Sequence, residues 1–189
     1  AVVATPRLDG LSVSYDYPAP VDVATGADRV RLMLGPVETQ AEIVAKAVPM
    51  VDDTAFVAAR FTNDTGEVLL PTRRARFFLD GAYVGERETG LIAAGAEAEM
   101  AFGPIEGLRL SRQIEDRGEG DQGLIRKSSR MTEAVVIEVE NLTEEGWPLR
   151  VIDRVPISEQ DALEIAWQAD PMPSERDVDG ARGILAWPF

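Results

Sequence analysis

The sequence predicts an all-β protein built as an antiparallel β-sandwich, with little or no helix. Polar and apolar side chains alternate along most of the chain, and proline, glycine or asparagine interrupts each alternating window. A period of two is typical of strands, because successive side chains point to opposite faces of a sheet. Apolar residues make up 45% of the 189 residues, which is enough for a substantial core.

The clearest alternation lies in the stretch T-E-A-V-V-I-E-V-E. Val135, Ile137 and Val139 fall on one face of a strand, whereas Glu138 points to the other face. Turn-forming residues follow, and a second strand is predicted over residues 149–155. We therefore expect these two strands to pair as neighbours.

The remaining windows alternate better than they fit the i, i+3, i+4 spacing of a helix. Residues 171–183 form the longest stretch without periodicity, and they are predicted to be a surface loop. The other windows predicted as strands are 11–17, 30–34, 37–48, 55–61, 97–102, 108–116, 124–131, 163–167 and 184–187.

The strongest local signal is the segment R-A-R-F-F-L-D-G-A-Y-V-G. Asp80 and Gly81 stand between two apolar runs, and this is the sequence of a two-residue type I′ hairpin turn. In the register that such a turn sets, Phe78 lies opposite Tyr83. The sequence therefore predicts a tight hairpin with two aromatic side chains near its tip.

Several arginines flank this predicted turn. Arg74 lies opposite Arg87 in the same register, and like charges that face each other are unfavourable. Glu86 and Glu88, or an anionic partner, should relieve the repulsion. An exposed arginine face is favoured over a dedicated anion site. The candidate binding residues of this hairpin are Arg74, Arg76, Tyr83 and Arg87.

Three more candidate binding residues lie in the second half of the chain. Trp147 stands in a predicted turn and is the tryptophan most expected to be exposed to a partner. Asp153 ends a predicted strand beside Arg154, and an ion pair or a turn hydrogen bond is favoured there over catalysis. Paired carboxylates of a glycosidase carry little weight, because 33 acidic residues make such pairs common by chance.

A weak internal similarity suggests two lobes. Residues 54–65 and 132–143 align without gaps, and Thr, Val, Asn and Thr coincide. Either a duplicated lobe or shared strand-to-turn chemistry would explain the match. We predict an N-terminal β lobe over residues 1–103 and a C-terminal β-sandwich lobe over residues 104–189, which could also pack as one domain.

The sequences beginning at Asn63 and Asn141 both fit the pattern of an N-glycosylation acceptor. Asn and Thr side chains also form hydrogen bonds to nearby backbone groups in tight turns. The turn is the favoured interpretation at both positions.

Composition excludes several classes of function. The formal net charge of −14 disfavours binding to nucleic acid and to anionic lipid. The absence of histidine and cysteine removes imidazole bases, thiol nucleophiles and the usual zinc ligands. We therefore predict no catalytic residue, no metal and no cofactor, and no stretch is apolar enough to span a membrane.

The order of several segments resembles the C-terminal domain of the mucoidy-inhibitor A (MuiA) family. The most specific pieces are D-G-A-Y-V-G and D-R-V-P-I-S-E, and the similarity covers residues 37–189. The usual L-G-x-D-D segment of that family reads F-G-P-I-E-G here, without both aspartates. The resemblance implies a longer bacterial protein with an N-terminal domain and a coiled coil. It also implies export to the periplasm or cell envelope and a link to exopolysaccharide, without an established activity.

These observations favour a non-enzymatic binding or assembly module of a larger bacterial cell-envelope protein. The alternative is a carbohydrate-active or carbohydrate-binding domain that acts on exopolysaccharide through carboxylates and exposed aromatic side chains. The expected partner is another protein or the N-terminal and coiled-coil parts of the same polypeptide, with polysaccharide as a further option.

Overall fold

The fold is known from a computed structural model that describes residues 3–9, 12–122, 128–160 and 162–189. These residues form strands and one short 3-10 helix, so the predicted all-β class is confirmed. Within the same ranges, no helix is long and apolar enough to cross a membrane.

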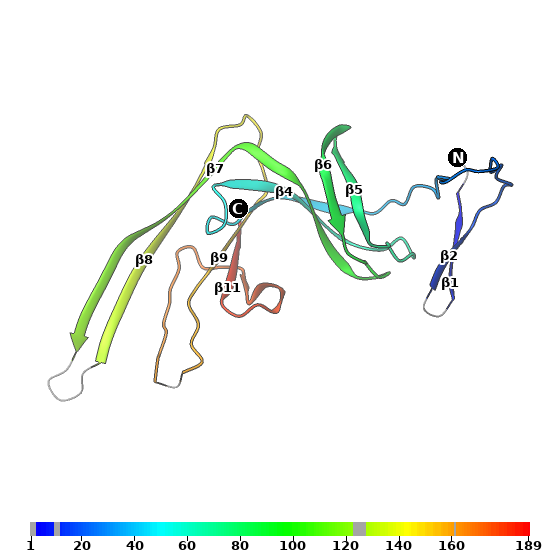
Figure 1. The fold of residues 1–189 in the computed structure, drawn as a ribbon. Coiled ribbons are helices and arrows are strands. Elements are labelled where there is room, and N and C mark those ends of the chain that lie inside the picture. Colours follow the sequence, from blue (N-terminus) through cyan, green and yellow to red (C-terminus); the bar gives the residue numbers. More distant parts are fainter. Residues whose placement is uncertain (1–2, 10–11, 123–127, 161) are drawn as a thin grey trace. The chain divides into compact units, whose positions relative to one another are not determined.

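The strands are named in chain order (Figure 1). The 3-10 helix, η1, spans Val178–Gly180 and precedes the last strand. The strands are β1 (Thr5–Asp9), β2 (Ser12–Asp16), β3 (Ala41–Ala47), β4 (Thr54–Thr62), β5 (Thr72–Leu79), β6 (Ala82–Thr89), β7 (Glu97–Gln122), β8 (Ser128–Asn141), β9 (Leu149–Arg154), β10 (Glu175–Arg176) and β11 (Ile184–Pro188).

Seven strands form the main sheet in the order β10-β11-β9-β3-β4-β7-β8, and β1–β2 and β5–β6 form two separate pairs. The predicted pairing of residues 149–155 with the preceding strand is wrong, because β8 pairs with β7 whereas β9 lies between β11 and β3. The sheet is also not purely antiparallel, since β3 runs parallel to β9 with Lys46 beside Arg150. Alternation defines the faces of a strand but does not define its neighbour.

Contacts divide the chain into two units, each discontinuous in sequence. The division into lobes 1–103 and 104–189 stays a prediction, and residues 103 and 104 both lie within β7. One unit consists of residues 1–41, 61–73 and 88–98, and the other consists of residues 42–60, 74–87 and 99–189.

The main core lies on one face of the seven-stranded sheet. Small side chains such as Ala45 and Ala55 are completely buried there, which allows close packing over the middle strands. Leu79 of β5 packs against the same core, so the β5–β6 hairpin contributes to it as in a sandwich. The buried members of the core are Ala45, Ala47, Ala55, Val57, Ile105, Leu108, Leu110 and Val151.

Two predicted strands are not strands in the structure. Residues 30–34 and 163–167 are extended or irregular, and Leu32 remains 42% exposed and Leu163 54% exposed. The window 37–48 forms a strand only from Ala41 onward. Alternation makes a segment suitable for a sheet, but a strand also needs a neighbour for its backbone hydrogen bonds.

Two other predictions need correction at their boundaries. The predicted loop 171–183 contains the short strand β10 and the 3-10 helix η1, which return the chain to the sheet edge. In the window 124–131, residues 128–131 begin β8, whereas residues 124–127 lie outside the described residues.

The two N-x-T segments form the same turn, as predicted. Asn63 Nδ2 donates to the Glu67 carbonyl at 2.8 Å, and Asn141 Nδ2 donates to the Glu145 carbonyl at 2.8 Å. In each turn the threonine hydroxyl two residues later donates to the asparagine Oδ1 at 2.7 Å. Both asparagine side chains therefore close turns at the ends of strands.

Candidate functional site

The β5–β6 hairpin has the predicted turn at its tip. Asp80 has φ 49° and Gly81 has φ 83°, as a type I′ turn requires. Phe78 and Tyr83 meet across the hairpin edge to face, with ring centroids 5.6 Å apart. Phe78 is 52% exposed and Tyr83 is 59% exposed, so the pair presents aromatic surface to solvent.

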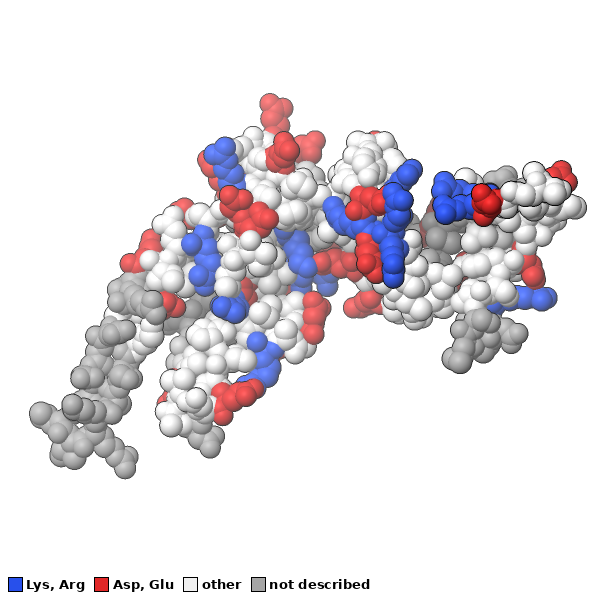
Figure 2. All heavy atoms as spheres, viewed as in Figure 1, with Lys and Arg blue, Asp and Glu red and all other residues white. Residues whose placement is uncertain are grey.

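Two arginines on this hairpin share one carboxylate. Arg74 Nε donates to Glu86 Oε1 at 2.7 Å, and Arg76 Nε lies 3.6 Å from Glu86 Oε2. The hydrogen bond from Arg74 lowers the pKa of Glu86 below its ordinary value, and the same bond raises the pKa of Arg74. The side chains of Arg74 and Arg76 are 77% and 66% exposed, and Lys and Arg side chains gather over this hairpin (Figure 2).

Arg87 does not belong to this arginine face. Its guanidinium donates to the Ala101 carbonyl of β7 and lies 5.4 Å from the centroid of the Phe77 ring. Phe77 in turn packs edge to face on Phe102 at 5.3 Å. Arg87 therefore connects the hairpin to β7 and does not present a free cation to solvent.

A glycine marks the point in β6 at which the inward-facing positions change. Gly85 has φ 141°, a conformation that other residues rarely adopt. Val84 is half-buried, as are Arg87 and Thr89, so the inward-facing positions change from even to odd at this residue. Such a phase change is what a β-bulge produces.

The other candidate residues make structural contacts. Asp153 is 8% exposed, and its carboxylate accepts hydrogen bonds from Arg112 Nε at 3.2 and 3.0 Å, which is the predicted kind of ion pair. Arg154 is exposed at the end of β9. Trp147 is not an exposed turn residue, because its ring packs half-buried against the main core. Its indole N–H is buried without a hydrogen-bond partner among the described residues.

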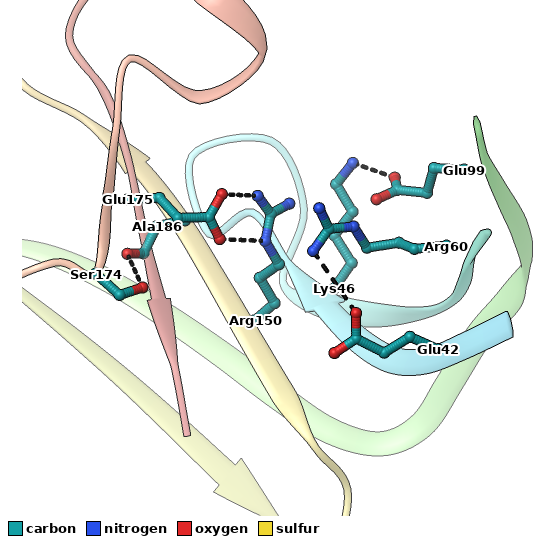
Figure 3. Close-up of polar contacts among 8 residues, drawn as sticks. All are labelled: Glu42, Lys46, Arg60, Glu99, Arg150, Ser174, Glu175 and Ala186. Atoms are coloured by element: carbon teal, nitrogen blue, oxygen red, sulfur yellow. Dashed lines mark hydrogen bonds and ion pairs between the residues drawn. The ribbon is translucent and has the colours of Figure 1, made fainter. Parts of the chain in front are cut away.

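An ion pair made by a buried arginine, on the face of the sheet opposite the main core, was missed by sequence reasoning. Arg150 is 6% exposed and makes a bidentate pair with Glu175 of β10, with N–O distances of 3.2 and 2.8 Å. The pairs Lys46–Glu99 and Arg60–Glu42 lie on the same face (Figure 3).

The strand register explains why this face needs carboxylates. Lys46 lies beside Arg150 in the parallel ladder of β3 and β9, so two cations are neighbours. Their flanking residues, Ala45, Ala47 and Val151, belong to the main core on the other face. The signal in the sequence was a charged residue between two buried apolar residues. The sequence does not show which acidic residue pairs with it.

A comparison with models of known protein families matches almost the whole chain. Residues 4–189 match the family model DUF4139, a domain of unknown function. The chain belongs to the DUF4139 family. No curated protein and no solved structure matches it. The finer resemblance to mucoidy-inhibitor A proteins stays a prediction.

We expect the Arg150–Glu175 pair to make the stability of the DUF4139 domain depend on pH. The hydrogen bond from Arg150 lowers the pKa of Glu175 from its ordinary 4.5. A carboxyl with a lowered folded pKa stabilises the fold above its unfolded pKa, and this contribution is lost as pH falls through the folded pKa. Glu175→Gln should therefore be less stable than the parent by about 1 kcal/mol at neutral pH.

Denaturant unfolding at neutral pH and near pH 3 measures this effect. The difference between Glu175→Gln and the parent DUF4139 domain should shrink as the pH is lowered, because the parent carboxyl loses its charge as the pH falls through its folded pKa. Glu42→Gln serves as the matched control, since Glu42 is 69% exposed and 3.9 Å from Arg60. An equal loss in both variants at both pH values would contradict the prediction.

Proposed function

We propose that this DUF4139 domain is a non-enzymatic binding module and that the β5–β6 hairpin is its contact surface. The observation that carries the proposal is the exposed Phe78–Tyr83 pair beside two exposed arginines that both contact Glu86. Arginine and tyrosine are enriched among the residues that dominate binding energy at protein interfaces. A type I′ turn holds the aromatic pair next to the tip of this short hairpin.

The charge of the hairpin indicates the kind of partner. Figure 2 shows Lys and Arg side chains gathered over this hairpin, in a chain whose formal net charge is −14. A protein segment that carries carboxylates next to an apolar side chain would complement both parts of the surface. Such a segment would come from another cell-envelope protein or from another part of the same longer polypeptide. The envelope location rests on the resemblance to the mucoidy-inhibitor A family.

A carbohydrate-binding role is the second candidate, and exposed Tyr83 is the observation that favours it. The tryptophans support it less. Trp147 packs on the core, and Trp187 Nε1 donates to the Pro171 carbonyl at 2.8 Å. The Arg176 guanidinium lies over the Trp167 ring, 5.1 Å from its centroid.

The test compares partner capture by the parent and by Arg74→Glu/Arg76→Glu, using immobilised domain and bacterial envelope extract. Charge reversal should reduce capture of the bound protein by roughly tenfold or more, because it replaces attraction by repulsion. Arg7→Glu is the control, since Arg7 is also an exposed arginine, 3.0 Å from Asp16 in the β1–β2 hairpin. Equal capture by all three proteins would contradict the proposal.

A glycan array with Tyr83→Ala distinguishes the second candidate. Glycan binding that disappears in Tyr83→Ala, together with unchanged protein capture by the arginine variant, would replace the protein-binding proposal by the carbohydrate one. Far-UV circular dichroism checks that each variant retains the β fold.

A further inference from the structure

Strand β8 leaves one edge of the seven-stranded sheet without a neighbouring strand among the described residues. In the ladder, Val139 lies opposite Leu110, whose N–H donates to the Asp53 carbonyl at 2.8 Å, away from β8. In antiparallel sheets, two such opposed residues both direct their backbone groups away from each other. The backbone groups of Val139, and by alternation those of Ile137 and Val135, therefore point to the open edge.

A second segment of the chain has the pattern of a strand but no place in a sheet. Residues 29–34 read R-V-R-L-M-L, and Val30 and Leu32 are 45% and 42% exposed. Within the described residues, this segment makes one backbone hydrogen bond, from the Ala4 N–H to the Leu34 carbonyl at 2.7 Å. Its apolar side chains stay partly exposed, and its backbone groups lack the hydrogen-bonded neighbour that a strand normally has.

These two features complement each other in a single antiparallel register. The apolar residues of the segment would extend the face on which Ile137 and Val139 pack against the main core. The arginines would lie on the other face, beside the exposed glutamates of β8. The opposed pairs are Arg29 with Glu140, Val30 with Val139, Arg31 with Glu138, Leu32 with Ile137 and Met33 with Val136.

We propose that residues 29–33 of one copy of this chain add as an antiparallel strand to the open edge of β8 in a second copy. The register places both arginines opposite glutamates, and a one-residue shift would turn every arginine to the apolar face. A two-residue shift would leave only one arginine opposite a glutamate. The charged pattern thus selects one alignment.

The surroundings of the two glutamates are compatible with an added strand. Glu138 accepts a hydrogen bond from the Ser111 hydroxyl at 3.3 Å, and Arg109 lies opposite Glu140 in the β7–β8 ladder. These neighbours all lie on the β7 side, so the other side of each glutamate faces the open edge. Sheet extension of this kind is an established mode of protein association.

The charge and the residue pattern of residues 29–34 indicate that the strand added to the open edge of β8 comes from a second copy of this chain. The segment R-V-R-L-M-L contains no acid in a chain of net charge −14, and its complement is present in the chain itself. Donor segment and acceptor edge are different surfaces, so the contact is head to tail and each copy can engage two others. This inference is independent of the hairpin proposed above as a contact surface.

Cysteine cross-linking tests the register, because the natural chain contains no cysteine. Arg31 and Glu138 would form a non-hydrogen-bonded pair, whose Cα atoms lie about 4.5 Å apart, within the range of a disulfide. Arg31→Cys and Glu138→Cys proteins, mixed and mildly oxidised, should give a disulfide-linked heterodimer. Thr132→Cys, on the same strand, is the matched control and should link poorly to Arg31→Cys.

Two results would overturn the proposal. One is cross-linking of Arg31→Cys to Glu138→Cys at the level of the Thr132→Cys control. The other is a single chain with both substitutions that forms its disulfide within itself when diluted, which would show that the segment pairs in the same copy.

Charge reversal gives an independent measurement by sedimentation. Arg29→Glu/Arg31→Glu and Glu138→Arg/Glu140→Arg should each weaken self-association by roughly tenfold or more, and mixing the two variants should restore association. Neither change should alter partner capture by the hairpin. A parent protein that stays monomeric at millimolar concentration, or a mixture no stronger than its components, would overturn the second-copy assignment.

Discussion

Replacing Gly183 by alanine should lower the free energy of unfolding by about 3 kcal/mol, the sum of backbone strain and steric overlap. Gly183 has φ 77°, and an added Cβ would lie 2.8 Å from the Val155 carbonyl oxygen and 2.7 Å from Ile157 Cγ2. The backbone cannot move freely, because the Val155 N–H donates to the Gly183 carbonyl at 2.9 Å and the Gly183 N–H donates to Asp177 Oδ1 at 2.7 Å.

Gly180→Ala is the matched control for this experiment. Gly180 has φ 76°, but an added Cβ would meet nothing within 4 Å. Gly180→Ala should therefore lower the free energy of unfolding by about 1 kcal/mol, because it adds backbone strain alone. Tryptophan fluorescence during denaturant unfolding follows both variants. Equal losses for the two glycines would mean that the close approach to Val155 does not constrain the fold.

Replacing Asn63 by alanine should destabilise the protein by about 3 kcal/mol, because buried carbonyl groups would lose their donor. The Asn63 side chain is completely buried, and its Nδ2 donates to the carbonyls of Glu67, Ile92 and Ala93 at 2.8, 3.1 and 3.1 Å. Alanine cannot supply these hydrogen bonds, and water cannot reach the carbonyls without opening the turn.

Asn141→Ala supplies the control for Asn63→Ala, since Asn141 closes the same turn while exposed to solvent. Water can replace its hydrogen bonds, so the expected loss is about 1 kcal/mol. Far-UV circular dichroism during denaturant unfolding compares the two. If Asn141→Ala lowered the free energy of unfolding as much as Asn63→Ala, burial of the asparagine would not determine how much stability is lost.

Features that depend on neighbours in sequence could be predicted. The Asp80-Gly81 turn and the facing of Phe78 and Tyr83 follow from residues within one hairpin, and both are present in the structure. The N-x-T turns also depend on side chains only a few residues apart. Local hydrogen bonds and steric preferences decide such features without help from the rest of the chain.

The candidate site was predicted only in part. Arg74, Arg76 and Tyr83 lie on the hairpin as expected, whereas Arg87 turns inward after Gly85. Trp147 was expected in solvent but packs on the core. The turn that contains Trp147 is visible in the sequence, but whether its ring finds an apolar surface depends on distant strands.

The largest omission is the pair formed by Arg150 and Glu175. These residues are 25 positions apart and meet only because β10 reaches β9 through β11 at the sheet edge. Any of the 33 acidic residues could have been the partner from sequence alone.

The sequence by itself determined the all-β class, the two faces of most strands, the hairpin turn and the acidic, histidine-free composition. Only the tertiary structure decided which strands are neighbours, where β3 and β9 run parallel, which charges are buried and which alternating segments stay outside a sheet. The physical reason is that backbone hydrogen bonds between strands are nearly the same for every sequence. The choice of neighbour therefore depends on side-chain packing summed over the whole core, which no single segment contains.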